Sequence, residues 1–284
     1  MDNLIFLKLG GSLITDKLTP RTVRPDVLER LCAEIASARE RDPNLALVLG
    51  HGSGSFGHVA AKQYRTRDGI PLNPPTVLSD ISPQGGENFP LHYWHGFTEV
   101  WHEARALNVH VMDALRASGI PSMALPGSAS VIAHDGKVTA WDVEPFRRAL
   151  GNGILPVVYG DVIFDEVRGG TILSTEDLFM HLARELRPQR VLLAGLEDGI
   201  YADFPARKHR VEVVTLQSFG ELSASIGASA GTDVTGGMDS KVRQMLALVE
   251  EIEGLSVQLF SGEIAGATEQ ALRGEKTGTL ITAK

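Results

Sequence analysis

Short apolar runs bounded by glycine, proline or charged residues recur along the chain and predict buried strands. Most of these runs are apolar at successive positions instead of alternate ones, which is typical of parallel strands covered on both faces. The seven runs lie at 4–9, 45–49, 122–125, 154–159, 191–194, 256–260 and 279–282. Together they predict one large sheet.

Apolar residues at helical spacing lie between these strands. The helical patterns are Val27, Leu28, Leu31 and Ile35 behind Pro25; Trp94, Phe97, Val100 and Trp101, continuing toward Leu115; Leu178, Leu182 and Leu186; and Val242, Leu246 and Val249. Strands that alternate with helices predict an α/β fold, here a three-layer α/β/α sandwich around a mainly parallel sheet. Asp135-Gly136 lies between two short apolar runs and predicts a β-hairpin added to that sheet.

The chain is expected to form a single domain over residues 1–284. A change of composition at Arg168-Gly169-Gly170 predicts two lobes on one continuous sheet, residues 1–168 and residues 169–284. The stretch 65–89 carries several prolines and a Gly-Gly pair, which predicts a long surface loop of the kind that forms lids.

Composition narrows the function classes. The chain has 35 acidic and 27 basic residues, a formal charge of −8, and this balance argues against a surface that neutralises nucleic acid. No apolar run approaches the roughly 18 residues of a membrane span, so no membrane partner is expected. Cys32 is the single cysteine and excludes a disulfide within the chain. A cytoplasmic protein is therefore expected.

Lys8-Leu9-Gly10-Gly11-Ser12 follows the first predicted strand. Adjacent glycines let the backbone turn and present N–H groups to an anion, and Lys8 adds a positive charge beside them. The alternative is a plain strand-to-loop turn with a solvated lysine. Lys17 follows in Thr15-Asp16-Lys17, and taken alone it is typical of a surface charge.

The segment His51-Gly52-Ser53-Gly54-Ser55-Phe56-Gly57-His58 follows the second predicted strand. Its glycines and serines predict a nest of backbone N–H donors for a phosphate group, and His58 is placed to bond the same anion. His51 is more typical of a structural residue. The segment also matches G-x-G-x-x-G, which leaves a dinucleotide-binding fold as an alternative, although Asp68, the acid about 20 residues on, follows no strand pattern.

Thr235-Gly236-Gly237-Met238-Asp239-Ser240-Lys241 predicts a helix start at which backbone N–H groups and Lys241 face an anion. A capped helix with an exposed lysine is the alternative. The sequence contains no G-x-x-x-x-G-K-[ST] segment, so a P-loop nucleotide site is not expected.

Taken in order, these motifs resemble the amino acid kinase superfamily. The resemblance also covers Asp198-Gly199-Ile200-Tyr201 and the closing Gly278-Thr279-Leu280-Ile281, and it spans nearly the whole chain. It implies the amino acid kinase fold, ATP and Mg²⁺ as cofactors, and a homodimer. Within the superfamily, Ser55-Phe56-Gly57-His58 and the early Lys17 resemble isopentenyl phosphate kinases, and fosfomycin kinases have a similar layout.

The resemblance implies that residues 1–168 bind the acceptor and residues 169–284 bind the nucleotide. The residues expected to bind ATP are Lys8, Gly10, Gly11, Ser12, Asp198, Tyr201, Gly236, Gly237 and Lys241. Those expected to bind the acceptor are Gly52, Ser53, Gly54, His58, Gly160 and Asp161, although an Asp at a strand end is as often a turn former. The expected catalytic residues are Lys8, Lys17, His58, Glu176 and Lys241, and no residue is expected to bind a metal.

Two departures from the family pattern affect these expectations. Ser53 replaces the middle glycine of H-G-G-G-S-F-G-H, so the loop must shift if that position needs a positive φ. The family's S-G-D-D segment reads Ser174-Thr175-Glu176-Asp177 here. We assign Glu176 to the role that orients the lysines, with Asp177 as the competing residue.

The predicted reaction is ATP-dependent phosphorylation of a small monophosphate, most simply isopentenyl phosphate to isopentenyl diphosphate. A monophosphate is largely dianionic at neutral pH, so its phosphorylation needs charge compensation more than a general base. The nearest alternative is the same fold acting on a phosphonate antibiotic, an amino acid or a nucleoside monophosphate. A non-catalytic nucleotide-sensing module is a further alternative, and a dinucleotide-binding oxidoreductase is the third.

Overall fold

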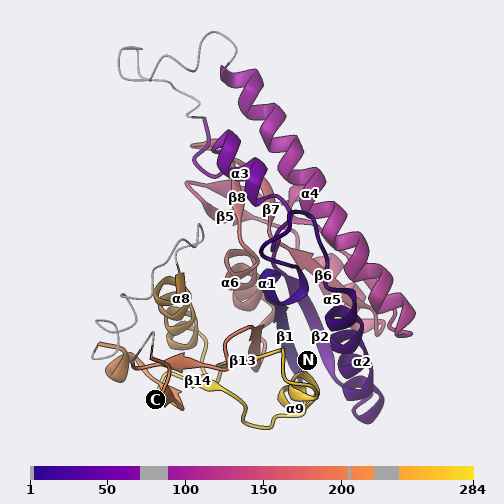
Figure 1. Cartoon of the computed structure of the whole chain (residues 1–284), viewed down its shortest axis with the longest axis vertical. Helices are drawn as coiled ribbons and strands as arrows, with labels where there is room; N and C mark the ends of the chain where they lie inside the picture. The colour runs from indigo at the N-terminus through magenta and orange to yellow at the C-terminus, as the bar shows by residue number, and fades with distance from the viewer. Residues whose placement is uncertain (1–2, 71–88, 204–205, 221–236) are drawn as a thin grey trace.

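The computed structural model describes residues 3–70, 89–203, 206–220 and 237–284, and an eight-stranded sheet forms its centre (Figure 1). The strand order is β12-β14-β13-β9-β1-β2-β6-β3, and all neighbouring pairs are parallel except β13 and β14. The strands are β1 (Leu4–Leu9), β2 (Ala46–His51), β3 (Ser122–Ala124), β6 (Leu155–Tyr159), β9 (Arg190–Gly195), β12 (Val213–Val214), β13 (Ser256–Ser261) and β14 (Thr279–Ile281). All seven predicted strands are present, whereas β12 was not predicted.

Helices cover both faces of the sheet, because successive residues of each central strand point to opposite sides. On one side, α2 (Pro25–Arg41), α4 (Phe89–Ala117) and α9 (Ala267–Leu272) pack with Leu7 and Leu9 of β1. On the other side, α5 (Glu144–Gly151), α6 (Thr175–Leu186) and α8 (Gly237–Glu251) pack with Phe6. The predicted three-layer α/β/α sandwich is therefore confirmed.

The Asp135-Gly136 hairpin forms, but it does not join the main sheet as predicted. It links β4 (Ile132–His134) to β5 (Lys137–Ala140) in a separate sheet of order β5-β4-β7-β8, with β7 (Asp161–Asp165) and β8 (Gly169–Leu173). The reason is non-local pairing, because β4 runs parallel to β7 with Ile132 opposite Phe164. The predicted lobe boundary near 168 falls in the turn between β7 and β8, and the assignment of the two lobes stays a prediction.

The remaining short elements lie around these two sheets. They are α1 (Gly11–Ile14), α3 (His58–Tyr64), the 3₁₀ turn Gly127–Ala129, β10 (Ile200–Tyr201) and β11 (Arg210–Val211). Most of the stretch predicted to form a lid, residues 71–88, lies outside the described residues. Within the described ranges, no helix combines the length and apolar character that crossing a membrane requires.

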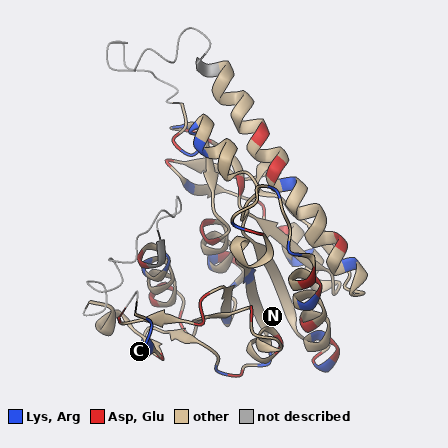
Figure 2. Ribbon diagram, in the orientation of Figure 1, with Lys and Arg blue, Asp and Glu red and all other residues tan. Residues whose placement is uncertain are grey.

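A buried carboxylate on α2 fixes α9 and the turn before it. Glu34 pairs with Arg30 (2.7 Å) and accepts hydrogen bonds from the backbone N–H groups of Gly266 (2.9 Å) and Thr268 (3.0 Å). It therefore caps the first turn of α9 from a different helix. Acidic and basic residues are mixed along α2 (Figure 2), but Glu34 differs from the exposed ones because it is buried and bonded to backbone.

We predict that Glu34→Ala lowers the free energy of unfolding by about 2–4 kcal/mol, because it leaves two N–H groups and part of Arg30 without their carboxylate. Urea denaturation measures the change. Glu29→Ala, at an exposed position of the same helix, is the control and should stay within about 0.5 kcal/mol of the original protein. Equal losses in both variants would contradict the capping role.

Candidate active site

The first two glycine motifs form one continuous surface at the carboxyl ends of β1 and β2. These strands are neighbours in parallel register, with Leu9 opposite His51. The loops that follow them touch: a Cβ added to Gly11 would lie 2.1 Å from the Gly54 nitrogen, and one added to Gly52 would lie 2.8 Å from the Gly11 nitrogen. Only glycine allows this approach. Two predicted anion-binding loops therefore lie side by side.

Ser53 does not strain the second loop. Gly54 and Gly57 have positive φ angles of 55° and 78°, whereas Ser53 is absent from the five non-glycine residues with positive φ in the described part of the chain. The serine therefore fits this backbone without the shift that the sequence left open.

A buried ion pair lies next to these loops. Lys8, near the end of β1, and Glu176, in the first turn of α6, pair at 2.9 Å between Nζ and Oε1, and both side chains are about nine-tenths buried. Burial alone would raise the pKa of Glu176, but the charges of Lys8 and Lys241 outweigh it and the pKa lies below its usual value. The structure thus brings two predicted lysines and the predicted acidic residue close together.

The structure also separates Glu176 from its competitor. Asp177 forms a capping box with Ser174: the Ser174 hydroxyl accepts from the Asp177 N–H, and Asp177 accepts from the Ser174 N–H. Its other oxygen accepts a hydrogen bond from Gln244 at 3.2 Å. Asp177 therefore holds the helix start, and the contact with Lys8 belongs to Glu176.

Lys17 and His58 lie on the exposed side of the loops. Lys17 is carried by the segment 15–23, which a bridge between Thr15 and Val23 closes. Thr15 Oγ1 donates to the Gly11 carbonyl (2.8 Å) and accepts from the Ser55 N–H (2.9 Å), so this segment contacts both glycine loops. His58 is exposed and is the first residue of α3. Neither residue joins the Lys8–Glu176 ion pair in a described contact.

His51 is buried beneath the second loop. Its Nδ1 bonds the Gly52 carbonyl and its Nε2 faces Asn108, each at 3.2 Å, and its ring stacks on Tyr159 at 5.1 Å between centroids. Burial lowers the pKa of His51 to about 4, so the ring is neutral near pH 7. This position fits the structural role predicted for it.

Gly160 and Asp161 lie where β6 passes into β7. The Gly160 N–H donates to Thr175 Oγ1 at 3.0 Å. Asp161 is fully buried, and burial raises the pKa of its carboxyl group to about 6, although hydrogen bonds from Ser128 and Val162 offset part of the effect. Asp161 therefore lies beneath the site surface. Gly160 is bonded through its N–H to the side chain of Thr175 in α6.

The third glycine motif is only partly described. Gly236 lies outside the described residues, and Gly237 begins α8. Lys241 follows in the second turn of that helix, where its charge acts on Glu176. Within the described ranges, no group of three or more His, Cys, Asp or Glu side chains is arranged to hold a metal ion.

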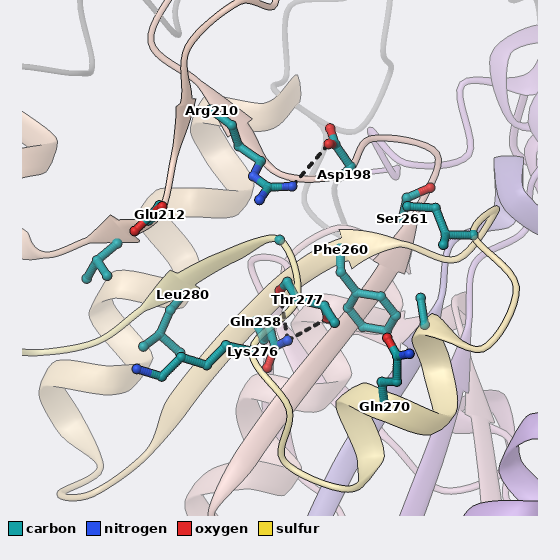
Figure 3. A pocket seen from close by; sticks show the side chains of 14 residues that line it. Asp198, Arg210, Glu212, Gln258, Phe260, Ser261, Gln270, Lys276, Thr277 and Leu280 are labelled. Atoms are coloured by element: carbon teal, nitrogen blue, oxygen red, sulfur yellow. Dashed lines mark hydrogen bonds and ion pairs between the residues drawn. The ribbon is translucent and has the colours of Figure 1, made fainter.

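Asp198 and Arg210 line a pocket of about 430 Å³ that the sequence did not predict (Figure 3). The Tyr201 hydroxyl donates to Asp198 at 2.5 Å and Arg210 donates to its other oxygen at 3.2 Å, and these contacts lower the pKa of Asp198. Side chains such as Phe260 and Lys276 line the pocket. Phe260 comes from β13 and Lys276 from the turn before β14, and the closing motif contributes Gly278 and Leu280.

This pocket does not coincide with the predicted phosphate site. Phe260 points to the side of the sheet covered by α9, because it alternates with Val257 and Leu259, which pack under α8. Lys8 and Glu176 lie on the α8 side. Of the residues predicted to bind ATP, Asp198 borders the pocket, whereas Ser12 lies beside the first glycine loop, in α1.

Comparison with known proteins identifies the family. The sequence model of the amino acid kinase family matches residues 3–261. The chain belongs to the amino acid kinase family. It is 37% identical to isopentenyl phosphate kinase of Methanothermobacter thermautotrophicus over 99% of this chain and 100% of that protein. It is 32% identical to isopentenyl phosphate kinase of Haloferax volcanii, over 98% of each.

A solved structure of isopentenyl phosphate kinase has the same fold, with a TM-score of 0.79 and 32% identity over 99% of this chain and 100% of that one. The family and the fold predicted from the motifs are both confirmed. The comparisons do not test individual site residues, whose roles remain predictions.

We predict that stability falls as pH rises through the titration of Asp161. Its pKa is about 6 in the folded protein, against an ordinary value of 3.8. The unfolded chain loses the proton first, so the free energy of unfolding should drop by up to about 3 kcal/mol between pH 4 and pH 7 through this group. The free energy of unfolding of Asp161→Asn, measured by urea denaturation, should rise relative to that of the original protein as the pH increases over that range. Asp113→Asn, at an exposed position, is the control, and the proposed titration is wrong if both variants follow the same pH curve.

We predict that Glu176→Gln slows phosphoryl transfer about 100-fold or more, because it removes the charge that holds Lys8. Asp177→Asn keeps the Lys8 contact and should change kcat less than about fivefold. Steady-state kinetics with ATP compares the two. A larger loss in the Asp177 variant would reverse the assignment.

Proposed function

We propose that this protein is an isopentenyl phosphate kinase, which transfers the γ-phosphoryl group of ATP to isopentenyl phosphate and releases ADP. The observation that carries the proposal is the direct contact between the two glycine loops beside the Lys8–Glu176 ion pair. A kinase with a phosphate acceptor needs two anion sites within reach of each other. Two relatives that are 37% and 32% identical over nearly the full chain have this activity in their names.

In this proposal, the protein contributes position and charge to the transfer. Gly11 offers its backbone N–H to the transferring phosphoryl group, with Lys8 beside it. Gly10, also expected to bind ATP, instead donates its N–H to the Ala194 carbonyl at 2.8 Å. Lys17 and Lys241 offset the charge on the β- and γ-phosphates. The acceptor is dianionic, so its oxygen attacks phosphorus while the bond to the β-phosphate oxygen breaks, and no proton needs to be removed first.

The acceptor side is assigned to the second loop. The N–H groups of Ser53 and Gly54 and the side chain of His58 hold the acceptor phosphate, and Gly160 closes the site from the neighbouring strand. The Gly52 N–H instead donates to the Leu9 carbonyl at 3.0 Å. An apolar tail would suit the region next to this loop, where the buried side chains of Tyr93, Phe97 and Val162 form an apolar cluster and residues of α3 pack against it. This cluster supports an isoprenoid acceptor over an amino acid.

ATP and Mg²⁺ are the proposed cofactors. The described residues offer no cluster of protein ligands for a metal. This fits Mg²⁺, which commonly binds through substrate phosphates, one or two carboxylates and water. We propose that it enters with ATP and neutralises phosphate charge. A role in isoprenoid precursor synthesis, a homodimer and a cytoplasmic location are further parts of the proposal.

An ADP-release assay with ATP tests the acceptor. We expect turnover with isopentenyl phosphate and dimethylallyl phosphate to exceed that with fosfomycin, uridine monophosphate and N-acetylglutamate by at least about 100-fold in kcat/KM. Turnover of another acceptor alone would keep a kinase and overturn the isoprenoid assignment. No turnover of any acceptor, with ATP still bound, would favour a sensing module.

We predict that His58→Ala lowers kcat/KM for the prenyl phosphate about 100-fold, because it removes a contact to a charged oxygen. His102→Ala, an exposed histidine on α4, is the matched control and should match the original protein. An unchanged His58 variant would remove this residue from the acceptor site.

A further inference from the structure

A single hydroxyl group joins the ends of two strands beneath the proposed acceptor site. Thr175 Oγ1 donates to the His51 carbonyl at 2.6 Å and accepts from the Gly160 N–H at 3.0 Å. Thr175 is buried and is the first residue of α6. The hydroxyl therefore uses its one hydrogen and one of its lone pairs on backbone groups of β2 and of the residue that follows β6.

The two backbone groups lie in the two segments assigned to the acceptor. His51 directly precedes Gly52, and Gly160 lies in the second segment itself. The rings of His51 and Tyr159 stack at 5.1 Å between centroids, which adds a second link between the same strand ends. A change in the separation of β2 and β6 would therefore move both acceptor segments relative to each other.

Packing fixes the side chain of Thr175. A Cβ added to Gly50 would lie 2.6 Å from Thr175 Cγ2 and 2.6 Å from Phe179 Cζ, so the glycine leaves just enough room for the methyl group. A threonine with its methyl group confined has few χ1 states open to it. The hydroxyl is consequently held toward the two strand ends.

Thr175 also precedes the residue that pairs with Lys8. The same helical turn thus carries a hydroxyl bonded to the acceptor segments and the carboxylate of Glu176 bonded to the lysine of the first glycine motif. In the family pattern S-G-D-D, this position is a glycine, which has no hydroxyl.

We propose that Thr175 is a positioning residue that sets the distance between the acceptor segments after β2 and β6 and ties them to the Lys8–Glu176 ion pair. This inference rests on the proposed function, since it takes those segments as the acceptor site. Thr175 touches neither substrate in this proposal and acts through Gly160 and the His51 carbonyl.

Two variants of Thr175 and one control test the proposal. Thr175→Val keeps the shape and removes the hydroxyl, whereas Thr175→Ser keeps the hydroxyl and removes the methyl group. Thr268→Val is the matched control, because the Thr268 hydroxyl is fully buried and has no hydrogen-bond partner within the described residues. Hydrogen exchange of the Gly160 amide is measured first, since it does not depend on the acceptor, and kinetics with isopentenyl phosphate follow.

In Thr175→Val we expect protection of the Gly160 amide to fall about tenfold, KM for isopentenyl phosphate to rise about tenfold, and KM for ATP to change less than about twofold. Thr175→Ser should restore most of the Gly160 protection and most of the affinity for the acceptor, and Thr268→Val should change neither. The proposal fails if Thr175→Val exchanges and turns over like the original protein, or if exchange changes while KM for the acceptor does not.

Failure of the proposed function would look different. The original protein would then not turn over isopentenyl phosphate at all, and the exchange of Gly160 would still decide whether the Thr175 bridge exists. If Thr175→Val unfolds, protection is lost throughout the sheet. The KM of Thr175→Ser for isopentenyl phosphate is then the test: it should stay near that of the original protein, and a tenfold rise would contradict the role of the hydroxyl.

Discussion

The close contact between two glycine loops is the constraint on which the rest of the site depends. β1 and β2 are parallel neighbours, so the chain leaves both strands at the same edge, and the two turns compete for the same space. Side chains at Gly11, Gly52 or Gly54 would collide with the opposite loop. The loops meet as bare backbone, and in the proposed function the N–H groups of Gly11, Ser53 and Gly54 serve two phosphates that are close enough to react.

The Lys8–Glu176 ion pair shows why stability and function differ in their demands at this site. Removing two charges from water costs free energy that their attraction seldom fully restores, so an apolar pair of similar volume would serve the fold as well. The role proposed for Lys8, to face a phosphate at the end of β1, excludes such a replacement. Glu176 holds Lys8 in place, and Asp177 caps α6 instead of competing for the lysine.

Much of this architecture was predictable from local patterns, and the failures have a common physical cause. Buried runs such as 4–9 and helices such as the one behind Pro25 can be predicted from a few neighbouring residues. The hairpin at Asp135-Gly136 was also recognised, but its sheet was not, because pairing with Phe164 is set by residues far away in the chain. The glycine motifs predicted two loops that the structure brings into contact, whereas the α9-side pocket and the Thr175 bridge combine segments far apart in the chain, whose proximity no single motif predicts.

The central place of β1 in the sheet has a consequence for folding during synthesis on the ribosome. This strand emerges first, yet one of its two hydrogen-bonding edges belongs to β9, which is synthesised only after more than half of the chain. Until then an apolar strand presents an open edge to other chains. Nascent chains interrupted before β9 should therefore depend on chaperones far more than the finished protein does.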